Sequence, residues 1–485
     1  MIKPVMLWTD ALVFLLLVVI AFFVWIVHRH EHLAEPWRKV GHSASGMAAL
    51  VVLSCFVLIG FLDTLHYRIS VPGKDGKTTY AVEVLSVLDA AVGPLRTQKE
   101  KTYSAPLATR LFAKETVQGS DGRESREFPR LRYGGADLKD VQREHLSDVL
   151  QRAAAGLAGG LLLWLLPVAW ACARVARRSN TGLWAAGQSI LRRETRIPWH
   201  AILLAMGAVC IVTGPIMALA AQYHVFGTDK VGQDVLYLSL KSIRPGLIIG
   251  TLTTLVMLPF ALALGIMAGY FRGWVDDVIQ YLYTTLHSIP GVLLIAAAVL
   301  MMQVYVENHA SLFPTTVERA DFRLLFLCLI LGVTSWTSLC RLLRGESLKL
   351  REMEYIQAAH AFGVSHARIM MRHILPNVMH IVLIAVVMDF SGLVLAEAVL
   401  SYIGIGVDPS MNSFGSMINS ARLEMAREPM VWWSLAAAFS FMLVLVLAAN
   451  LFGDAVRDAL DPRVSNRKAM PVAPVTSAGN REVSA

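Results

Sequence analysis

The stretch EYIQAAHAFGVSHARIMMRHILPN, residues 354–377, is the one long polar segment that lies between two strongly apolar runs and still has the composition of a helix. Gly363 interrupts it. A glycine inside a helix costs about 1 kcal/mol relative to alanine, so Gly363 predicts the end of a short helix. Ser365 is a suitable N-cap for a second, basic helix, and Pro376 predicts the end of that helix. The predicted order is a helix, a glycine elbow, a basic helix and then a membrane span. This order indicates a membrane protein that is moved by a cytoplasmic partner.

Residues 354–377 resemble the EAA loop of ABC-importer permeases, and their form is similar to the dipeptide, oligopeptide and nickel branch. Gln357 replaces the usual glutamate, and His373 stands where isoleucine is usual. The positions that match the family pattern are Gln357, Ala358, Ala359, Gly363, His373, Leu375 and Pro376. Arg368 and Arg372 are spaced i, i+4 and are predicted to share one helix face, where they either pair with a partner or lie at the anionic inner leaflet. The alternative is an interfacial amphipathic connector without a partner.

The composition is that of a membrane protein. Of the 485 residues 55% are hydrophobic and only 16% are charged, against about 25% charged in ordinary soluble chains. The net charge of +8 comes from basic residues beside apolar runs, which indicates a membrane-lipid partner and no nucleic-acid partner. The five cysteines show no CxxC spacing, so neither a metal site nor a disulfide framework is expected.

The fold class expected is an all-α polytopic membrane protein with about nine transmembrane helices. The predicted spans are residues 11–27, 46–65, 154–173, 202–221, 245–270, 281–302, 324–339, 381–403 and 432–451. The first span is followed by more positive charge than precedes it, which places the N-terminus outside the cytoplasm. The basic loop at 174–196 is predicted to be cytoplasmic, and the polar segment after the second span is predicted to be extracytoplasmic, with short strands at 67–71 and 79–85.

Five regions follow from these patterns: a two-span region at 1–65, the extracytoplasmic segment at 66–150, extra spans with the basic loop at 151–225, a permease domain at 226–463 and a disordered tail at 464–485. The resemblance implies a type I ABC importer permease core for the fourth region. Several stretches carry the resemblance there, and they are AGYFRGWVDD at 268–277, RLLRG at 341–345, EAVLSYIGIG at 397–406 and NLFGDAVRDALDPR at 450–463.

The stretch FGTDKVGQDV at 226–235 resembles the GTDxxGRDV segment that precedes the permease domain in the same branch, with Gln233 in place of the arginine. Its motif residues are Gly227, Thr228, Asp229, Gly232 and Asp234. The simpler interpretation is a glycine-rich turn with Asx capping.

Two carboxylates, Asp389 and Glu397, lie within an apolar run. Burying an unpaired carboxylate in a membrane is costly, so both are candidates for the transport pathway, although a structural hydrogen bond between helices explains them equally well.

The resemblance implies the permease subunit of an ATP-driven importer for peptides or peptide-like solutes in the bacterial inner membrane. Its implied partners are a second permease subunit, ABC ATPase subunits and a periplasmic solute-binding protein. The sequence carries no Walker A motif, metal cluster or nucleophile with a base, so we expect no enzyme activity and no cofactor, with ATP bound by the partner subunit. The alternatives are a secondary transporter, for which inverted repeats are expected, or a membrane anchor or assembly protein. The sequence leaves the solute open among dipeptides, oligopeptides, peptide antibiotics and nickel chelates.

Overall fold

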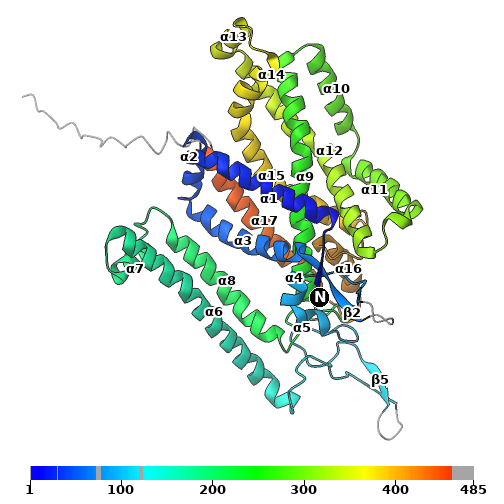
Figure 1. Ribbon diagram of the computed structural model, residues 1–485. Coiled ribbons are helices and arrows are strands. Elements are labelled where there is room, and N and C mark those ends of the chain that lie inside the picture. The colour runs from blue at the N-terminus through cyan, green and yellow to red at the C-terminus, as the bar shows by residue number, and fades with distance from the viewer. Residues whose placement is uncertain (1, 30, 73–77, 119–123, 461–485) are drawn as a thin grey trace, which may run out of the picture.

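The computed structural model describes residues 2–29, 31–72, 78–118 and 124–460, so residues 73–77, between the two predicted strands, and the predicted tail lie outside the described residues. Within these ranges nine helices are long and apolar enough to cross a membrane, which confirms the predicted number of spans. Figure 1 shows a tall group of helices, α9 to α15, with the helical pair α6 and α8 set to one side.

The N-terminal half begins with β1 (Ile2–Val5), α1 (Trp8–Arg29), α2 (Glu31–Val40) and α3 (Ala44–Thr64). The predicted extracytoplasmic segment contains β2 (His66–Pro72), β3 (Thr78–Tyr80), β4 (Leu85–Ser86), α4 (Val87–Ala91), α5 (Gly93–Thr97), β5 (Glu115–Gln118) and β6 (Glu124–Glu127). The extra spans are α6 (Val141–Ser179), α7 (Leu183–Leu191) and α8 (Trp199–Ala220).

The permease half contains α9 (Val235–Phe271), α10 (Trp274–Ser288), α11 (Gly291–Asn308), a short 3-10 turn η1 (Ala310–Leu312) and α12 (Thr316–Arg351). The elbow stretch forms α13 (Glu354–Ala361), α14 (His366–Ile369) and the π turn η2 (Met370–Ile374), and continues into α15 (Leu375–Tyr402). The chain then forms α16 (Phe414–Met425) and α17 (Trp433–Leu460).

The predicted span at 281–302 is wrong in its bounds. The chain leaves the helix at Ile289, whose φ and ψ are −85° and 128°, and α11 begins only after Pro290. The residue before a proline is pushed toward extended geometry, and Pro290 has no N–H to continue the helix, so one predicted span becomes two helices.

The strand predicted at 79–85 is also wrong. The chain bends between Tyr80 and Leu85, and its two ends pair separately with β2 as β3 and β4. β1 pairs antiparallel with the start of β2, through Ile2 opposite Ile69. This pairing fixes the N-terminus on the same side of the molecule as the predicted extracytoplasmic segment, as the charge pattern predicts.

The helices α6 and α8 pack closely because glycines face each other where they cross. A Cβ atom added at Gly156 would lie 2.5 Å from the Gly214 carbonyl oxygen, and one added at Gly160 would lie 2.4 Å from that of Cys210. Small residues allow two membrane helices to approach at the level of their backbones. The pair joins the rest of the molecule mainly through α8, which packs against α3.

The core of the permease half lies where α9, α12 and α15 meet. Met257 on α9, Leu343 on α12 and Val378 on α15 are almost completely buried in one apolar cluster. The same cluster includes Ile356 and Ile369 from the elbow. The elbow is therefore part of the packed core and holds a fixed position at one end of the three long helices.

Candidate functional site

The elbow turns sharply at Gly363, as the sequence predicts. α13 ends at Ala361, and Gly363 has φ of +74° in the left-handed region. The Gly363 N–H donates to the His360 carbonyl at 3.0 Å and the Val364 N–H donates to the Ala359 carbonyl at 3.1 Å. These two bonds form a Schellman motif, which satisfies the last carbonyls of α13 and requires positive φ at the position of Gly363.

The second part of the elbow differs from the prediction. Ser365 has the extended geometry of an N-cap but its side chain makes no capping hydrogen bond. The helix that follows does not end at Pro376, because the π turn η2 leads directly into α15, where Pro376 occupies the first turn. The helix runs without a break from His366 to Tyr402, and the wider π turn directly before Pro376 lets it pass the residue that has no N–H to donate.

The predicted loop residues differ in their exposure to solvent. The exposed ones are Gln357, Ala358, Arg368, Arg372 and Pro376, and the half-buried ones include His373 and Leu375. Ala359, one of the two alanines that match the family pattern, is half-buried against the chain's own core cluster. Ala358 is therefore the alanine that a partner can reach.

An apolar surface on the elbow was missed by sequence reasoning. Phe362 is 87% exposed at the tip of the turn, and Met371 and Tyr355 are also exposed. These exposed apolar side chains are available for contact with a partner. The sequence does contain a signal for this exposed side chain, namely a phenylalanine directly before the glycine. The residue before a Schellman glycine is the C-cap, which lies at the end of the helix.

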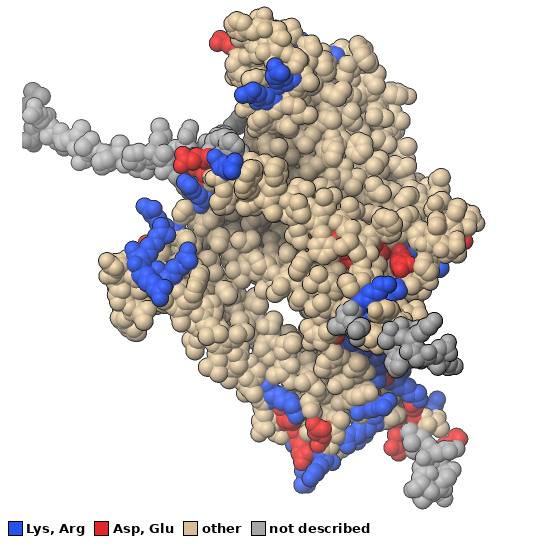
Figure 2. All heavy atoms as spheres, in the orientation of Figure 1, with Lys and Arg blue, Asp and Glu red and all other residues tan. Residues whose placement is uncertain are grey.

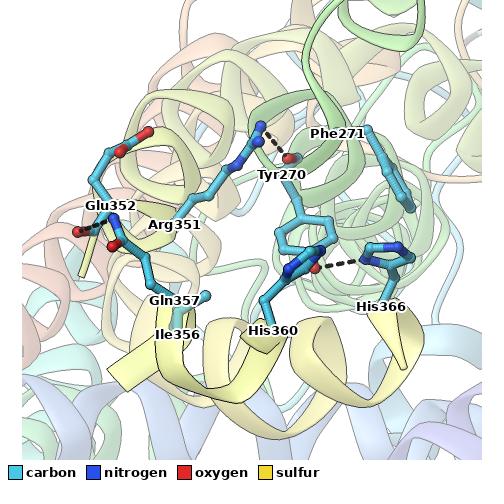
Figure 3. Close-up of a pocket in the computed structure, with 8 residues that line it drawn as sticks. All are labelled: Tyr270, Phe271, Arg351, Glu352, Ile356, Gln357, His360 and His366. Atoms are coloured by element: carbon cyan, nitrogen blue, oxygen red, sulfur yellow. Dashed lines mark hydrogen bonds between the residues drawn. The ribbon is translucent and has the colours of Figure 1, made fainter. Parts of the chain in front are cut away.

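A pocket of about 330 Å³ lies beneath the elbow (Figure 3). It is lined by Tyr270, Phe271, Arg351, Glu352, Ile356, Gln357, His360 and His366. The Tyr270 hydroxyl and His366 Nδ1 are hydrogen-bonded at 2.8 Å, and Arg351 Nη1 donates to the Tyr270 carbonyl at 2.8 Å. Arg351 thereby binds a carbonyl at the C-terminal end of α9, which has no intrahelical partner.

The polar groups of this pocket connect the elbow to the ends of the long helices. They are two imidazoles, a guanidinium, a carboxylate, an amide and a phenol, and the hydrogen bonds among them connect the ends of α9 and α12 to α13 and α14. Among the described residues no group of three His, Cys, Asp or Glu side chains could hold a metal ion.

Comparison with known proteins identifies the permease half. Residues 261–466 match the family model described as "Binding-protein-dependent transport system inner membrane component". The oligopeptide transport system permease protein OppC of Mycobacterium tuberculosis is 32% identical over 239 residues, which cover 49% of this chain and 76% of OppC. The chain belongs to this permease family.

A second relative agrees with this membership. The glutathione transport system permease protein GsiD of Pectobacterium atrosepticum is 31% identical over 245 residues, covering 50% of this chain and 74% of GsiD. A solved structure of the MetNI methionine ABC transporter, facing inward, aligns with a TM-score of 0.36 and 15% identity over 47% of this chain and 98% of that one.

Two family-like stretches of the permease meet beside the elbow. Arg344, from the stretch at 341–345, donates to both carboxylate oxygens of Asp276, from the stretch at 268–277, at 2.5 and 2.6 Å. Bidentate arginine–carboxylate pairs fix geometry as well as charge. The pair holds the start of α10 against α12.

The GTD-like stretch of the permease is a structural clamp. Asp234 caps α9 by accepting from the Leu236 and Tyr237 N–H groups, and Asp229 accepts from the Val231 and Gln233 N–H groups in an Asx turn, as the simpler interpretation predicts. The Thr228 hydroxyl donates to the Thr102 carbonyl at 2.9 Å, and Trp433 Nε1 donates to the Thr228 carbonyl at 2.9 Å.

The glycines of that stretch allow close contact with residues 100–104. A Cβ atom at Gly232 would lie 1.9 Å from the Glu100 carbonyl oxygen, and one at Gly227 would lie 2.4 Å from the Ser104 carbonyl oxygen. The stretch therefore joins the segment after α5 to the N-terminus of α9 and the start of α17.

A buried histidine completes this clamp. His224 Nδ1 lies 2.8 Å from Asp234 Oδ2, and its Nε2 lies 3.6 Å from Glu100 Oε1, a distance at which the contact is electrostatic and not a hydrogen bond. Burial alone would lower the pKa of His224, but the two carboxylates outweigh it and raise the pKa to about 9. The imidazole is therefore charged at neutral pH.

We expect this histidine to make the stability of the permease depend on pH. Its ordinary pKa is 6.5, so its contribution is fully present below about pH 6.5 and is lost as the pH rises through about 9. The expected loss of unfolding free energy is about 3 kcal/mol, since one pKa unit corresponds to about 1.4 kcal/mol. Thermal unfolding in detergent should therefore show Tm falling between pH 6.5 and 9, with a flat profile for His224→Gln.

The matched control is His145→Gln, at a histidine that is bonded to the Leu107 carbonyl, and it should keep the wild-type pH profile. A flat profile of Tm against pH in the wild type would contradict the assignment.

The two intramembrane carboxylates of the permease have different surroundings. Glu397 is 1% exposed and accepts a hydrogen bond from the Ser401 hydroxyl at 2.6 Å, which gives it a structural position within α15. Asp389 is half-buried, and among the described residues it has no hydrogen-bond or ion-pair partner. Of the two candidates, Asp389 is therefore the one whose carboxylate has no partner in the part of the chain that the structure describes.

A buried charge network was missed by sequence reasoning because its members are far apart in the chain. Arg244 on α9 donates to Asp10 Oδ1 at 2.7 Å and lies 3.5 Å from Asp321 Oδ1 on α12. The Thr9 N–H donates to Asp321 Oδ2 at 3.0 Å, and His66 Nδ1 lies 2.8 Å from Asp10 Oδ2. The network fastens the start of α1 to the permease helices.

Proposed function

We propose that the chain is the membrane-spanning permease subunit of an ATP-driven importer for peptides or peptide-like solutes in the bacterial inner membrane. The solute class rests on the family and on relatives whose names specify oligopeptide and glutathione transport. No ATP-binding motif occurs in the sequence, so ATP is assigned to a separate ABC ATPase subunit and the permease itself needs no cofactor.

One observation carries the coupling part of this proposal, namely a rigid elbow with an exposed aromatic tip. The Schellman turn at Gly363 presents Phe362 and Ala358 outward, while Ile356 and Ile369 are buried with residues of α9, α12 and α15. A force applied to the tip is therefore transmitted to three long helices at once. This supports assigning residues 354–377 as the surface that the ATPase holds.

The other partners follow from the family. A second permease chain would complete the pathway, and a periplasmic solute-binding protein would deliver solute to the outer mouth, on the side of the molecule that carries β1 and β2. Residues 226–463 form the permease domain of this proposal, while residues 1–225 are an addition to it.

Two experiments test the function. Co-purification of an ABC ATPase with the tagged chain separates an importer permease from a secondary transporter or an anchor protein, neither of which needs such a partner. Competitive uptake in a deletion strain, with dipeptides, longer peptides, glutathione and nickel chelates as competitors, identifies the solute class. An isolated chain that drives uptake without any ATPase would contradict the proposal.

Asp389 provides a prediction about the pathway. Loss of one unit charge facing the solute is expected to weaken uptake of cationic peptides about tenfold in Asp389→Asn, equivalent to about 1.4 kcal/mol, with neutral peptides little affected. The measurement is initial uptake rate for a cationic and a neutral peptide of equal length. Glu397→Gln is the control, because Glu397 is bonded inside the chain and should not change the charge preference. Unchanged uptake of both peptides in Asp389→Asn would exclude a pathway role.

A further inference from the structure

An apolar groove opens between α6 and α8, away from the permease helices. It measures about 490 Å³, within the range of ligand-binding pockets, and only apolar surface lines it. α6 contributes Leu166, Pro167 and Trp170, and α8 contributes Trp199, Leu203 and Met206. Such a groove can hold a hydrocarbon chain but offers no hydrogen-bonding partner to a polar solute.

One face of α6 leads from this groove into a cluster of arginines. Trp170, which lines the groove, is followed at intervals of four residues by Arg174 and Arg178, so each of these side chains lies beside the next on neighbouring turns of α6. The Arg174 guanidinium lies over the Trp170 ring, 5.3 Å from its centroid. The apolar groove and the first cation are therefore continuous.

The cluster carries far more positive than negative charge. Six arginines, all exposed, lie between residues 174 and 196, with Glu194 as the single acidic residue of that interval. Within the described chain none of these arginines forms an ion pair. Figure 2 shows the resulting blue patch around α7, at the end of the helical pair α6 and α8.

The surroundings place this cluster at a membrane surface. Trp170 and Trp199 lie edge to face, 5.6 Å apart, and tryptophan is enriched at the level of lipid headgroups. The short helix α7 buries Ala186 and Ile190 against the helical pair and exposes Leu183, Leu191 and Trp184, the last of these by 82%. An exposed apolar face beside clustered arginines is typical of a helix that lies in the interface.

We infer that the groove and the arginine cluster form a binding site for an anionic phospholipid, with an acyl chain in the groove and the phosphate at Arg174 and Arg178. An apolar slot alone would accept any lipid, and arginines alone would attract any anionic surface. The continuity of the two along one helix face selects a molecule that has both an acyl chain and a negative headgroup, at the leaflet where juxtamembrane arginines meet anionic lipid.

Native mass spectrometry of the full chain in detergent tests this site with two probes, dioleoyl phosphatidylglycerol and dioleoyl phosphatidylcholine. We expect one phosphatidylglycerol molecule to be retained preferentially. Arg174→Gln/Arg178→Gln should weaken that binding about 30-fold, from the usual contribution of two basic residues near an anionic membrane surface. Met206→Trp, which fills the groove and leaves every arginine in place, should weaken it independently.

Arg110→Gln/Arg143→Gln is the control, since it removes two exposed arginines outside residues 174–196, and Arg143 lies at the opposite end of α6 from Arg174. It should retain phosphatidylglycerol like the wild type. Equal retention of phosphatidylcholine, equal loss in the control, or unchanged binding in both Met206→Trp and the Arg174/Arg178 variant would each overturn the inference.

Discussion

Replacing Gly363 with valine is expected to abolish substrate uptake while the chain still inserts in the membrane. Gly363 has φ of +74°, and a β-branched residue there is strained by about 1–2 kcal/mol or more. No atom lies within 4 Å of the added Cβ, so the effect comes from backbone conformation and not from a clash. Relief of the strain would open the Schellman turn and turn Phe362 away from its position. In a reconstituted complex, ATP hydrolysis should no longer respond to the loaded binding protein.

Two variants distinguish backbone strain from other effects. Gly363→Asn should retain most uptake, since asparagine tolerates the left-handed region better than other residues with a Cβ. Gly159→Val, at an exposed glycine of α6 with equally open surroundings and no positive φ, should be neutral. Wild-type uptake and coupled hydrolysis in Gly363→Val would show that residues 354–377 do not couple the two subunits.

A large side chain on the outer face of α13 tests the same surface by another route. Ala358→Trp is preferable to Ala359→Trp, because Ala359 contacts the chain's own core and a tryptophan there would disturb packing as well. Ala358→Trp should lower both ATPase co-purification and uptake. Full co-purification with normal uptake would exclude Ala358 from the contact.

Removing Arg244 is expected to have the largest effect on stability. Arg244→Met would leave Asp10 and Asp321 buried without their cation, and breaking a buried ion pair on one side costs about 3–5 kcal/mol. We expect a markedly lower Tm in detergent and easier proteolysis after α1. The reason is that the network, and not a large apolar interface, fastens the start of α1 to α9 and α12.

The compensating variant makes this test specific. Arg244→Met combined with Asp10→Asn and Asp321→Asn removes the stranded charges and should recover much of the lost Tm. Arg143→Met, at an exposed arginine 3.8 Å from Asp140, should change stability by no more than about 0.5 kcal/mol. A Tm of Arg244→Met within the range of Arg143→Met would show that the network is not structural.

Local features of the elbow could be predicted from the sequence. The turn at Gly363 depends on residues within one helical turn of it, and the structure confirms the predicted end of the helix there. The spans were predictable because membrane helices are set by length and apolar content, which sequence shows directly.

Features that depend on distant neighbours could not be predicted. Pro290 and Pro376 both lie at apolar runs, yet the first ends α10 and the second begins α15 after a π turn. The sequence around a proline does not show which of these arrangements the neighbouring helices permit. Arg244 and Asp10 are 234 residues apart, so no pattern within a window of the sequence could pair them.

The glycine contacts between α6 and α8 also bear on the order in which the helices of the protein can assemble. The two helices are neighbours in the chain, and their main attachment, α3, precedes both of them. A nascent chain emerging at about 5–20 residues per second therefore has several seconds in which to bring these three helices together before α9 is complete. The added N-terminal half can thus assemble first in the membrane and act as the template against which the later helices insert.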